Sequence, residues 1–226
     1  MVIFKNMIKA IFLDWGQVFN ATLKNKDKKL DAILSPYGFT WKQFHPIWIK
    51  FYLLRSSGKI KTDKELGMYI KRVTQKDIPV EELVKAKIDG QFIPKDHIKA
   101  VRELKKKYKV GILSNHVDEW IKQTIKNYKI EKLFDSLTIS SAVGVRKPHA
   151  KIYYDALRKL SVKPKEAIFV ADEVAEDLVA ASGLGMKTVW FNTSNVSKED
   201  RDILKIYRPD AIVKNFKEII DVVKEM

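Results

Sequence analysis

Residues 11–20 of the chain are IFLDWGQVFN. An apolar run leads directly into one acid, Asp14, and Gly16 follows two positions later. Short and almost wholly apolar runs are typical of strands that are buried on both faces of a parallel sheet. Ligands of such sheets bind beyond the carboxyl ends of the strands. Asp14 therefore stands where a catalytic carboxylate is expected, and no second acid stands beside it.

Similar apolar runs recur along the chain and alternate with longer helical patterns. The expected strands are residues 10–13, 110–113, 136–139, 167–171, 188–191 and 211–213. The expected helices between the later strands are residues 95–107, 117–127, 149–160, 175–184 and 198–206. This alternation predicts an α/β fold, with a parallel sheet covered by helices on both faces in a three-layer, Rossmann-like core.

One segment interrupts the alternation. Residues 21–91 contain no convincing strand pattern, only helix signals, among them the capping-box sequence TDKE at 62–65. Gly90 and Pro94 mark the return to the alternating pattern. We therefore expect a core domain of residues 1–17 and 92–226, and a small helical cap domain of residues 18–91 inserted after the first strand.

Composition excludes several classes of protein. The chain has 226 residues, of which 46% are hydrophobic, and it contains no cysteine, so disulfides and thiolate metal sites are ruled out. No stretch approaches the roughly 18 apolar residues that a membrane span needs. The N-terminal MVIF is too short for the core of a signal peptide. These features predict a soluble cytoplasmic protein that does not bind membranes.

The formal charge of +15 raises the question of nucleic-acid binding. Only seven of the 43 basic residues are arginine, and the lysines are spread over the whole chain. Nucleic-acid binders more often gather Arg and Lys on one face. The pattern thus favours a lysine-rich, solvated surface over a nucleic-acid interface, and its positive field would attract small anions such as phosphate esters.

Polar side chains follow four of the expected strands. Asp14 follows the first, Ser114 and Asn115 follow the second, and Lys147 stands a few residues beyond the third. The fourth is followed by an acidic cluster in FVADEVAED, which consists of Asp172, Glu173, Glu176 and Asp177. Each of these residues taken alone has an ordinary explanation, such as a helix cap or a turn. Their occurrence together, each at a strand end, indicates a site.

The set is chemically coherent. The carboxylates of Asp14, Asp172 and Asp177 are oxygen ligands of the kind that Mg²⁺ prefers. Lys147 and Ser114 can neutralise and hydrogen-bond a phosphoryl group. Asp14 could then attack phosphorus and form an aspartyl-phosphate.

Four motifs, LDWGQV, ILSN, RKP and ADEVAED, occur in an order that resembles the haloacid dehalogenase superfamily. The resemblance covers nearly the whole chain and is to the large, phosphatase-containing branch with a helical cap after the first strand. It implies that Asp14 is the nucleophile and that Ser114 and Lys147 bind the transferring group.

The same resemblance implies the metal ligands. Asp172 would be a direct ligand of Mg²⁺ beside Asp14, and the backbone carbonyl of Gly16 would complete the coordination. Asp177 would hold a metal-bound water or orient Lys147. For Asn115 and Arg146 a substrate contact and a structural role stay equally open.

Gly16 departs from the family's usual D-x-D motif, in which the second Asp acts as general acid and base. Metal binding through the backbone can survive this change, whereas acid catalysis is lost. A good leaving group, slow turnover or a replacement acid would each account for the glycine. The candidates for a replacement are His45, His116 and Glu173.

The cap offers fewer clues to the substrate. Its aromatic residues recur at helical spacing, which is more typical of the cap's own core than of a binding site. Trp15, Arg55 and Lys59 are candidates for substrate contacts, and Arg55 stands just before a glycine turn. The sequence leaves open whether the protein is a monomer or a homodimer.

Three functions fit these residues. The first is a Mg²⁺-dependent phosphatase of small phosphorylated metabolites. The second is a 2-haloacid dehalogenase, in which Asp14 attacks carbon and the departing halide needs no proton. The third is a weakly active or non-catalytic binding protein with this fold. The acids of the fourth motif favour the phosphatase, because the resemblance implies that a dehalogenase does not need them.

Overall fold

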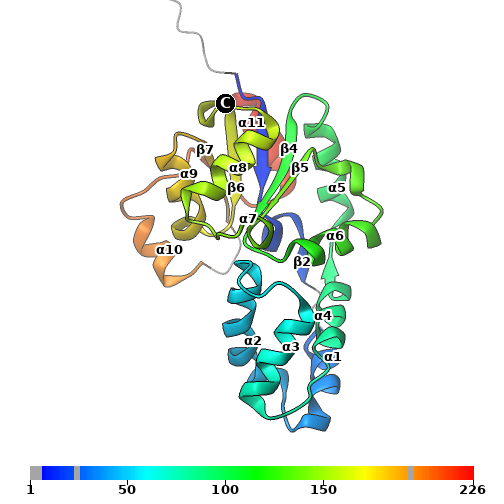
Figure 1. Cartoon of the computed structure of the whole chain (residues 1–226). Helices are drawn as coiled ribbons and strands as arrows, with labels where there is room; N and C mark the ends of the chain where they lie inside the picture. The colour runs from blue at the N-terminus through cyan, green and yellow to red at the C-terminus, as the bar shows by residue number, and fades with distance from the viewer. Residues whose placement is uncertain (1–6, 23–25, 193–195) are drawn as a thin grey trace, which may run out of the picture.

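The computed structural model describes residues 7–22, 26–192 and 196–226. Its centre is a six-stranded sheet in which every neighbouring pair of strands is parallel, in the order β5-β4-β1-β6-β7-β8 (Figure 1). The strands are β1 (Ala10–Leu13), β4 (Lys109–Ser114), β5 (Ser136–Ile139), β6 (Ala167–Ala171), β7 (Lys187–Phe191) and β8 (Ala211–Val213). The predicted α/β fold with a parallel sheet is confirmed.

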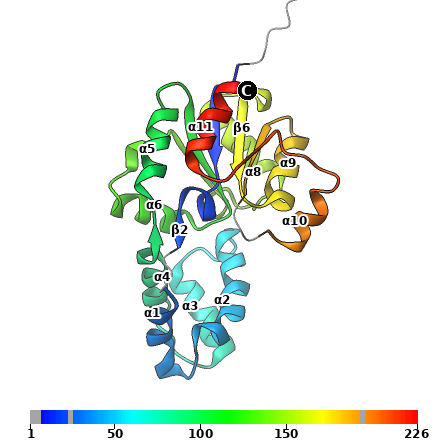
Figure 2. The same ribbon diagram turned by 180° about the vertical axis from the view of Figure 1, so that it is seen from behind.

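Helices cover both faces of this sheet (Figures 1 and 2). One face is covered by α5 (Lys95–Leu104), α6 (Asp118–Asn127) and α11 (Phe216–Glu225), and the other by α8 (Ala150–Leu160) and α9 (Val179–Gly183). Helices α7 (Ser140–Val143) and α10 (Lys198–Ile203) follow β5 and β7. None of the helices in the described part of the chain is long and apolar enough to cross a membrane.

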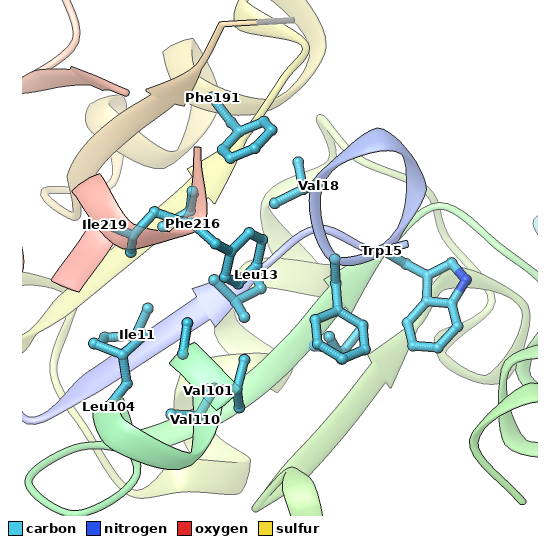
Figure 3. Packing of buried hydrophobic residues seen from close by; sticks show 14 of the residues in the cluster. Ile11, Leu13, Trp15, Val18, Val101, Leu104, Val110, Phe191, Phe216 and Ile219 are labelled. Atoms are coloured by element: carbon cyan, nitrogen blue, oxygen red, sulfur yellow. The ribbon is translucent and has the colours of Figure 1, made fainter. Parts of the chain in front are cut away.

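Strand β1 shows why an unbroken apolar run is needed at the centre of the sheet. Ile11 and Leu13 point into the cluster beneath α5 and α11 (Figure 3), whereas Phe12 points into the cluster beneath α8. All three side chains are completely buried. Burial of one such side chain contributes about 1.5–3 kcal/mol. A polar residue in this run would therefore destabilise one of the two helix layers.

The predicted helices 95–107 and 198–206 end earlier, at Leu104 and Ile203, and the short helix α7 was not expected. Two further differences concern the later part of the chain. The predicted helix 175–184 is divided into a short turn, Val174–Leu178, and α9. Helix α11 was not predicted from the sequence, although Asn215 caps it by accepting a hydrogen bond from the amide of Glu218. Its apolar side chains complete the cluster on the β1 face.

The predicted insert forms a group of four helices at the carboxyl end of the sheet (Figure 1). They are α1 (Lys26–Leu34), α2 (Trp41–Ser56), α3 (Asp63–Thr74) and α4 (Val80–Asp89). One expectation was wrong, because residues 21–91 do contain strand. β2 (Ala21–Thr22) pairs antiparallel with β3 (Gln91–Phe92), outside the main sheet. The two chain crossings run side by side there and satisfy each other's backbone groups. The domain boundaries 18–91 stay a prediction.

The capping box expected at residues 62–65 forms only in part. The hydroxyl of Thr62 accepts a hydrogen bond from the amide of Glu65, as in a capping box. The Glu65 carboxylate, however, accepts from the amide of Lys61 at 2.7 Å. A complete box occurs at the start of α2, between Thr40 and Gln43. Both helices thus begin at a side-chain cap.

The cap and the core share one apolar cluster. Val117 and Trp120, at the beginning of α6 in the core, pack within the cluster formed by the cap helices. The Trp120 ring stacks at 5.9 Å against both Trp48 and Tyr52 of α2. Its indole N–H donates to the carboxylate of Asp63 at 2.9 Å. The cap therefore packs firmly on α6 in this structure.

The closest approach of cap and core lies where α2 ends. The hydroxyl of Ser140, the first residue of α7, donates to the backbone carbonyl of Ser56. Gly58 has a φ of +72°, and a Cβ atom placed on it would lie 2.5 Å from the carbonyl oxygen of Ser141. We call this contact between residues 55–58 and residues 140–146 the seam. At position 58 only glycine fits both the positive φ and the short distance to the backbone of Ser141.

We predict that Gly58→Ala destabilises the protein more than Gly144→Ala. Both glycines have positive φ, so each alanine costs about 1–2 kcal/mol in backbone strain. A Cβ on Gly144 would have no atom within 4 Å, whereas one on Gly58 would collide with backbone. Urea unfolding of the two variants measures the difference. Equal losses of unfolding free energy would mean that the seam is not tightly packed.

Candidate active site

The strand order places the predicted site residues at one edge of the sheet. Strand β1 lies between β4 and β6, so the residues that follow these three strands are neighbours. Asp14 and Ser114 are 8% and 3% exposed. The amide of Asp14 donates to the carbonyl of Val170 at 2.9 Å, which continues the β1–β6 pairing to the acid itself. A rigid sheet therefore positions the nucleophile candidate.

Lys147 lies at the centre of the site. Its ammonium is 3.1 Å from Oδ1 of Asp14 and 2.7 Å from Oδ2 of Asp177. Burial alone would lower the pKa of Lys147, but the charges of Asp14 and Asp177 raise it above its ordinary value. The ammonium is thus charged at neutral pH. Three ionisable groups from distant parts of the sequence form one buried cluster, Asp14–Lys147–Asp177.

Asn115 holds the backbone of Lys147 in place. Its side-chain Nδ2 donates to the carbonyl of Lys147 at 3.1 Å, and its Oδ1 accepts from the amide of the same residue at 2.7 Å. The peptide bond between Lys147 and Pro148 is cis. The amide of Asn115 is therefore engaged in positioning Lys147, and the predicted contact of Asn115 with substrate stays a prediction.

The turn after β6 carries the acidic cluster. Its backbone is held by Asp200, which accepts hydrogen bonds from the amides of Val174 and Ala175 at 2.8 Å each. Burial, and then the charge of Asp14, raise the pKa of Asp172 to about 7. Asp177 is 1% exposed, and in the described part of the chain its Oδ1 has no hydrogen-bond partner.

These carboxyl groups fit a divalent cation. Asp14, Asp172 and Asp177 bring three acids to a site with the ammonium of Lys147, and among the described residues no donor reaches the buried Oδ1 of Asp177. Oxygen-rich sites with excess negative charge suit Mg²⁺. Side-chain oxygens of Glu173, Glu176 and Asp177 also lie within 4.8 Å of one another, and Asp14 and Asp172 are not in that group. The predicted set of metal ligands, which includes the carbonyl of Gly16, stays a prediction.

Gly16 is not required by the backbone. Its φ and ψ are −67° and 133°, which any L-residue adopts, and a Cβ placed on it would meet no atom within 4 Å. The positive φ in this turn belongs to Gln17, at 57°. The structure therefore has space for a side chain at position 16, and the missing acid is a chemical difference and not a steric necessity.

The three candidate replacement acids lie in different surroundings. Burial lowers the pKa of His116 to about 4, and its Nδ1 accepts from the amide of Val117, so a neutral imidazole is expected. His45 lies against Trp41 near the start of α2. Glu173 is exposed, although desolvation by neighbouring atoms and a hydrogen bond with Glu176 raise its pKa to about 8. None of these roles is settled by the geometry.

Two of the predicted substrate contacts are engaged elsewhere. Trp15 is completely buried in the cluster of Figure 3, and its indole N–H donates to Gln91 at 2.9 Å. Arg55 is 4% exposed and forms ion pairs with Asp63 and Glu119, each at 3.1 Å. Trp15 therefore packs the core and Arg55 holds the cap against α6, placements that do not support the predicted substrate contacts.

Tyr52 is a site neighbour that the sequence analysis missed. Its hydroxyl donates to the carbonyl of Asn115 at 3.3 Å, and its ring contacts His116. The sequence analysis assigned it to the aromatic stripe of the cap. Trp48, Phe51 and Arg55 of α2 are buried, whereas Tyr52 is half-buried and faces the core. A hydroxyl-bearing aromatic beside the buried stripe, close to a glycine turn, is the signal that could have identified it.

Comparison with known families agrees with this geometry. Residues 54–191 match the family model described as haloacid dehalogenase-like hydrolase. This chain belongs to that family. The match covers the second, third and fourth motifs, which supply Ser114, Lys147 and the acidic turn.

Among curated proteins, a glyceraldehyde 3-phosphate phosphatase of Pyrococcus furiosus is 35% identical over 129 residues, which are 56% of this chain and 52% of the relative. The chain spans about half the length of the curated relatives it matches. A family enzyme of Bacteroides thetaiotaomicron, solved with magnesium and inorganic phosphate, has a TM-score of 0.68 at 22% identity, over 85% of this chain and 98% of that one. A 2-haloacid dehalogenase of Pseudomonas syringae has a TM-score of 0.69 at 18% identity, over 97% and 99%. These structural similarities show the fold.

We predict that substitutions of Asp14 and of Lys147 have different effects on the stability of the fold. Asp14→Asn should leave the fold intact, since Lys147 keeps its 2.7 Å contact with Asp177. Lys147→Ala should lower the unfolding free energy by about 3–5 kcal/mol, because it leaves buried carboxylates without their cation. Urea unfolding followed by circular dichroism tests both. A stable Lys147→Ala variant would contradict the importance of this cluster.

Proposed function

We propose that this protein hydrolyses phosphate monoesters of small metabolites through an aspartyl-phosphate on Asp14, with Mg²⁺ as cofactor. The observation that carries the proposal is the buried Asp14–Lys147–Asp177 cluster at the carboxyl ends of adjacent parallel strands. In this cluster the ammonium of Lys147 lies directly beside the carboxylate of Asp14. A nucleophile and an anion-binding group are thereby brought to one point.

In the first step a carboxylate oxygen of Asp14 forms a bond to phosphorus as the bond from phosphorus to the ester oxygen breaks. The departing alkoxide takes a proton from water, because Gly16 offers no acid. In the second step water attacks the phosphorus of the aspartyl-phosphate and the P–O bond to Asp14 breaks, which restores Asp14 as a carboxylate. One proton of this water stays on the departing inorganic phosphate, and the other neutralises the hydroxide left in solvent by the first step.

Lys147 and Ser114 would hold the transferring group during both steps. The contact of Lys147 with Asp177 is shorter than its contact with Asp14, 2.7 Å against 3.1 Å. Asp177 can therefore serve as the permanent anchor of the ammonium, while the longer contact is exchanged for a phosphoryl oxygen. That exchange frees Asp14 to attack without leaving Lys147 unpaired.

Asp14, Asp172 and the carbonyl of Gly16 would hold the metal ion, with Asp177 acting through water. When bound there, Mg²⁺ would neutralise charge on the phosphoryl oxygens. The unpartnered Oδ1 of Asp177 and the excess of acids support this assignment. The names of the similar proteins, a glyceraldehyde 3-phosphate phosphatase and a family enzyme in complex with magnesium and inorganic phosphate, support it as well.

Metal removal provides the first test. Chelation should abolish phosphate release from a panel of phosphomonoesters, and added Mg²⁺ should restore it. Halide release from 2-chloropropionate is measured beside it, because the fold is equally similar to that of a dehalogenase. Turnover of phosphate esters in excess chelator would refute the metal assignment, and metal-independent halide release would favour the dehalogenase.

Gly16 provides the second test. Without a general acid, kcat/KM should fall steeply as the leaving-group pKa rises, so that aryl and anomeric sugar phosphates react faster than alkyl phosphates. Gly16→Asp should flatten this dependence, with gains of up to about 10²–10⁴-fold for the poorest leaving groups. The open space around position 16 makes a folded variant the expected outcome.

The measurement is the slope of log kcat/KM against leaving-group pKa in wild type and in Gly16→Asp. Thermal unfolding of the variant serves as the control for its fold. A flat wild-type slope, with chemistry limiting the rate, would show that another group already protonates the leaving oxygen.

A further inference from the structure

Arg146 is a charged residue of the seam whose role the mechanism above does not use. It directly precedes Lys147 and is half-buried. Its Nη1 donates to the hydroxyl of Ser56, in the cap, at 2.5 Å. Within the described residues no carboxylate lies at ion-pair distance from its guanidinium. A guanidinium carries five N–H donors, so most of its hydrogen-bonding capacity is unused by protein partners.

The other arginine of the seam shows what a purely structural role looks like. Arg55 is buried and is neutralised by the carboxylates of Asp63 and Glu119. Keeping a half-buried cation that has no counter-ion among the described residues is costly unless an anion joins it. The difference between the two arginines indicates that Arg146 is reserved for an anion that comes from outside the protein.

Arg146 lies close enough to the site to act on a substrate there. Burial raises the pKa of Tyr52, the charges of Arg146 and Lys147 lower it, and that of Asp14 raises it. The hydroxyl of Tyr52 therefore lies in the field of all three charged groups. His116 also experiences the charges of both Asp14 and Arg146. Arg146 thus belongs to the side of the site that faces the cap, where the leaving group of an ester held on Asp14 would extend.

We propose that the guanidinium of Arg146, together with the hydroxyl of Tyr52, recognises a second anionic group on the leaving group of the substrate. The preferred substrates are then small phosphate esters that also carry a carboxylate or a second phosphate, and not neutral sugar phosphates. A planar guanidinium suits both anions because it donates two parallel hydrogen bonds. This inference rests on the proposed phosphatase function and specifies its substrate class.

The test compares 3-phosphoglycerate with glycerol 3-phosphate. The two esters share a three-carbon leaving group and a primary ester oxygen, and they differ by a carboxylate in place of a hydroxymethyl group. Wild type should prefer 3-phosphoglycerate by about 10- to 100-fold in kcat/KM, the range expected for a charge-assisted hydrogen bond. Arg146→Gln should remove this preference and leave kcat/KM for glycerol 3-phosphate within a few-fold of wild type.

Two matched variants separate recognition from other effects. Arg158→Gln removes the same charge from an exposed arginine that is paired with Asp155, so it controls for the general attraction of anions by a basic protein. Ser56→Ala removes the hydroxyl to which Arg146 donates and keeps the guanidinium. Both variants should retain the preference for the carboxylate.

A binding measurement keeps the inference testable without turnover. Calorimetry on Asp14→Asn gives the dissociation constants of both esters, with and without Arg146→Gln, at fixed ionic strength. Failure of every phosphate ester to turn over would reject the proposed function, while the binding ratio would still test Arg146. Equal losses for both esters in Arg146→Gln, matched by Ser56→Ala, would overturn the inference and leave Arg146 as a seam contact only.

Discussion

A buried ammonium held between two carboxylates is the constraint on which the site depends. Moving Lys147, Asp14 or Asp177 singly into the interior would cost several kcal/mol, and only their mutual contact offsets that cost. Each member comes from a different element: the end of β1, the loop beyond α7 and the turn after β6. Two further polar residues, Asn115 and Asp200, fasten the backbone of the last two. The parallel sheet brings these elements together, and the charges then fix their distances.

The strand ends were predictable from the sequence because a central parallel strand has little freedom. It must be apolar on both faces, so its run is continuous and its first polar residue marks the carboxyl edge. Asp14 and Ser114 were located in this way, whereas Lys147, a few residues beyond the third strand, was identified with the RKP motif. Contacts across the seam were not predictable, since helical spacing in α2 shows which residues share a face but not what that face meets. The burial of Trp15 was not predictable for a related reason, because an aromatic beside an acid can turn into the core as easily as toward a ligand.

For Gly16 the sequence leaves two explanations open, and the structure removes one of them. From the sequence, a glycine in this position has two explanations, a backbone that demands it or a chemistry that dispenses with the acid. The ordinary torsion angles and the open space around it remove the first explanation. The missing acid then has a chemical explanation. Either the leaving group needs no proton, or a residue from another element donates it. Among the candidates, the neutral imidazole of His116 is poorly suited to donate a proton.

The seam links substrate binding to catalysis, because it lies between the cap and the site. Cap and core meet through Arg55, which two carboxylates neutralise, and through Arg146, which has no counter-ion in the part of the chain that the structure describes. Gly58 allows the backbones to approach closely beside them. A ligand that supplied the missing charge would be held by both lobes, since Tyr52 comes from the cap and Arg146 from the core. Its binding would stabilise the closed arrangement in proportion to its preference for that state. An anionic leaving group would thus hold the cap closed over Asp14 until that group departs.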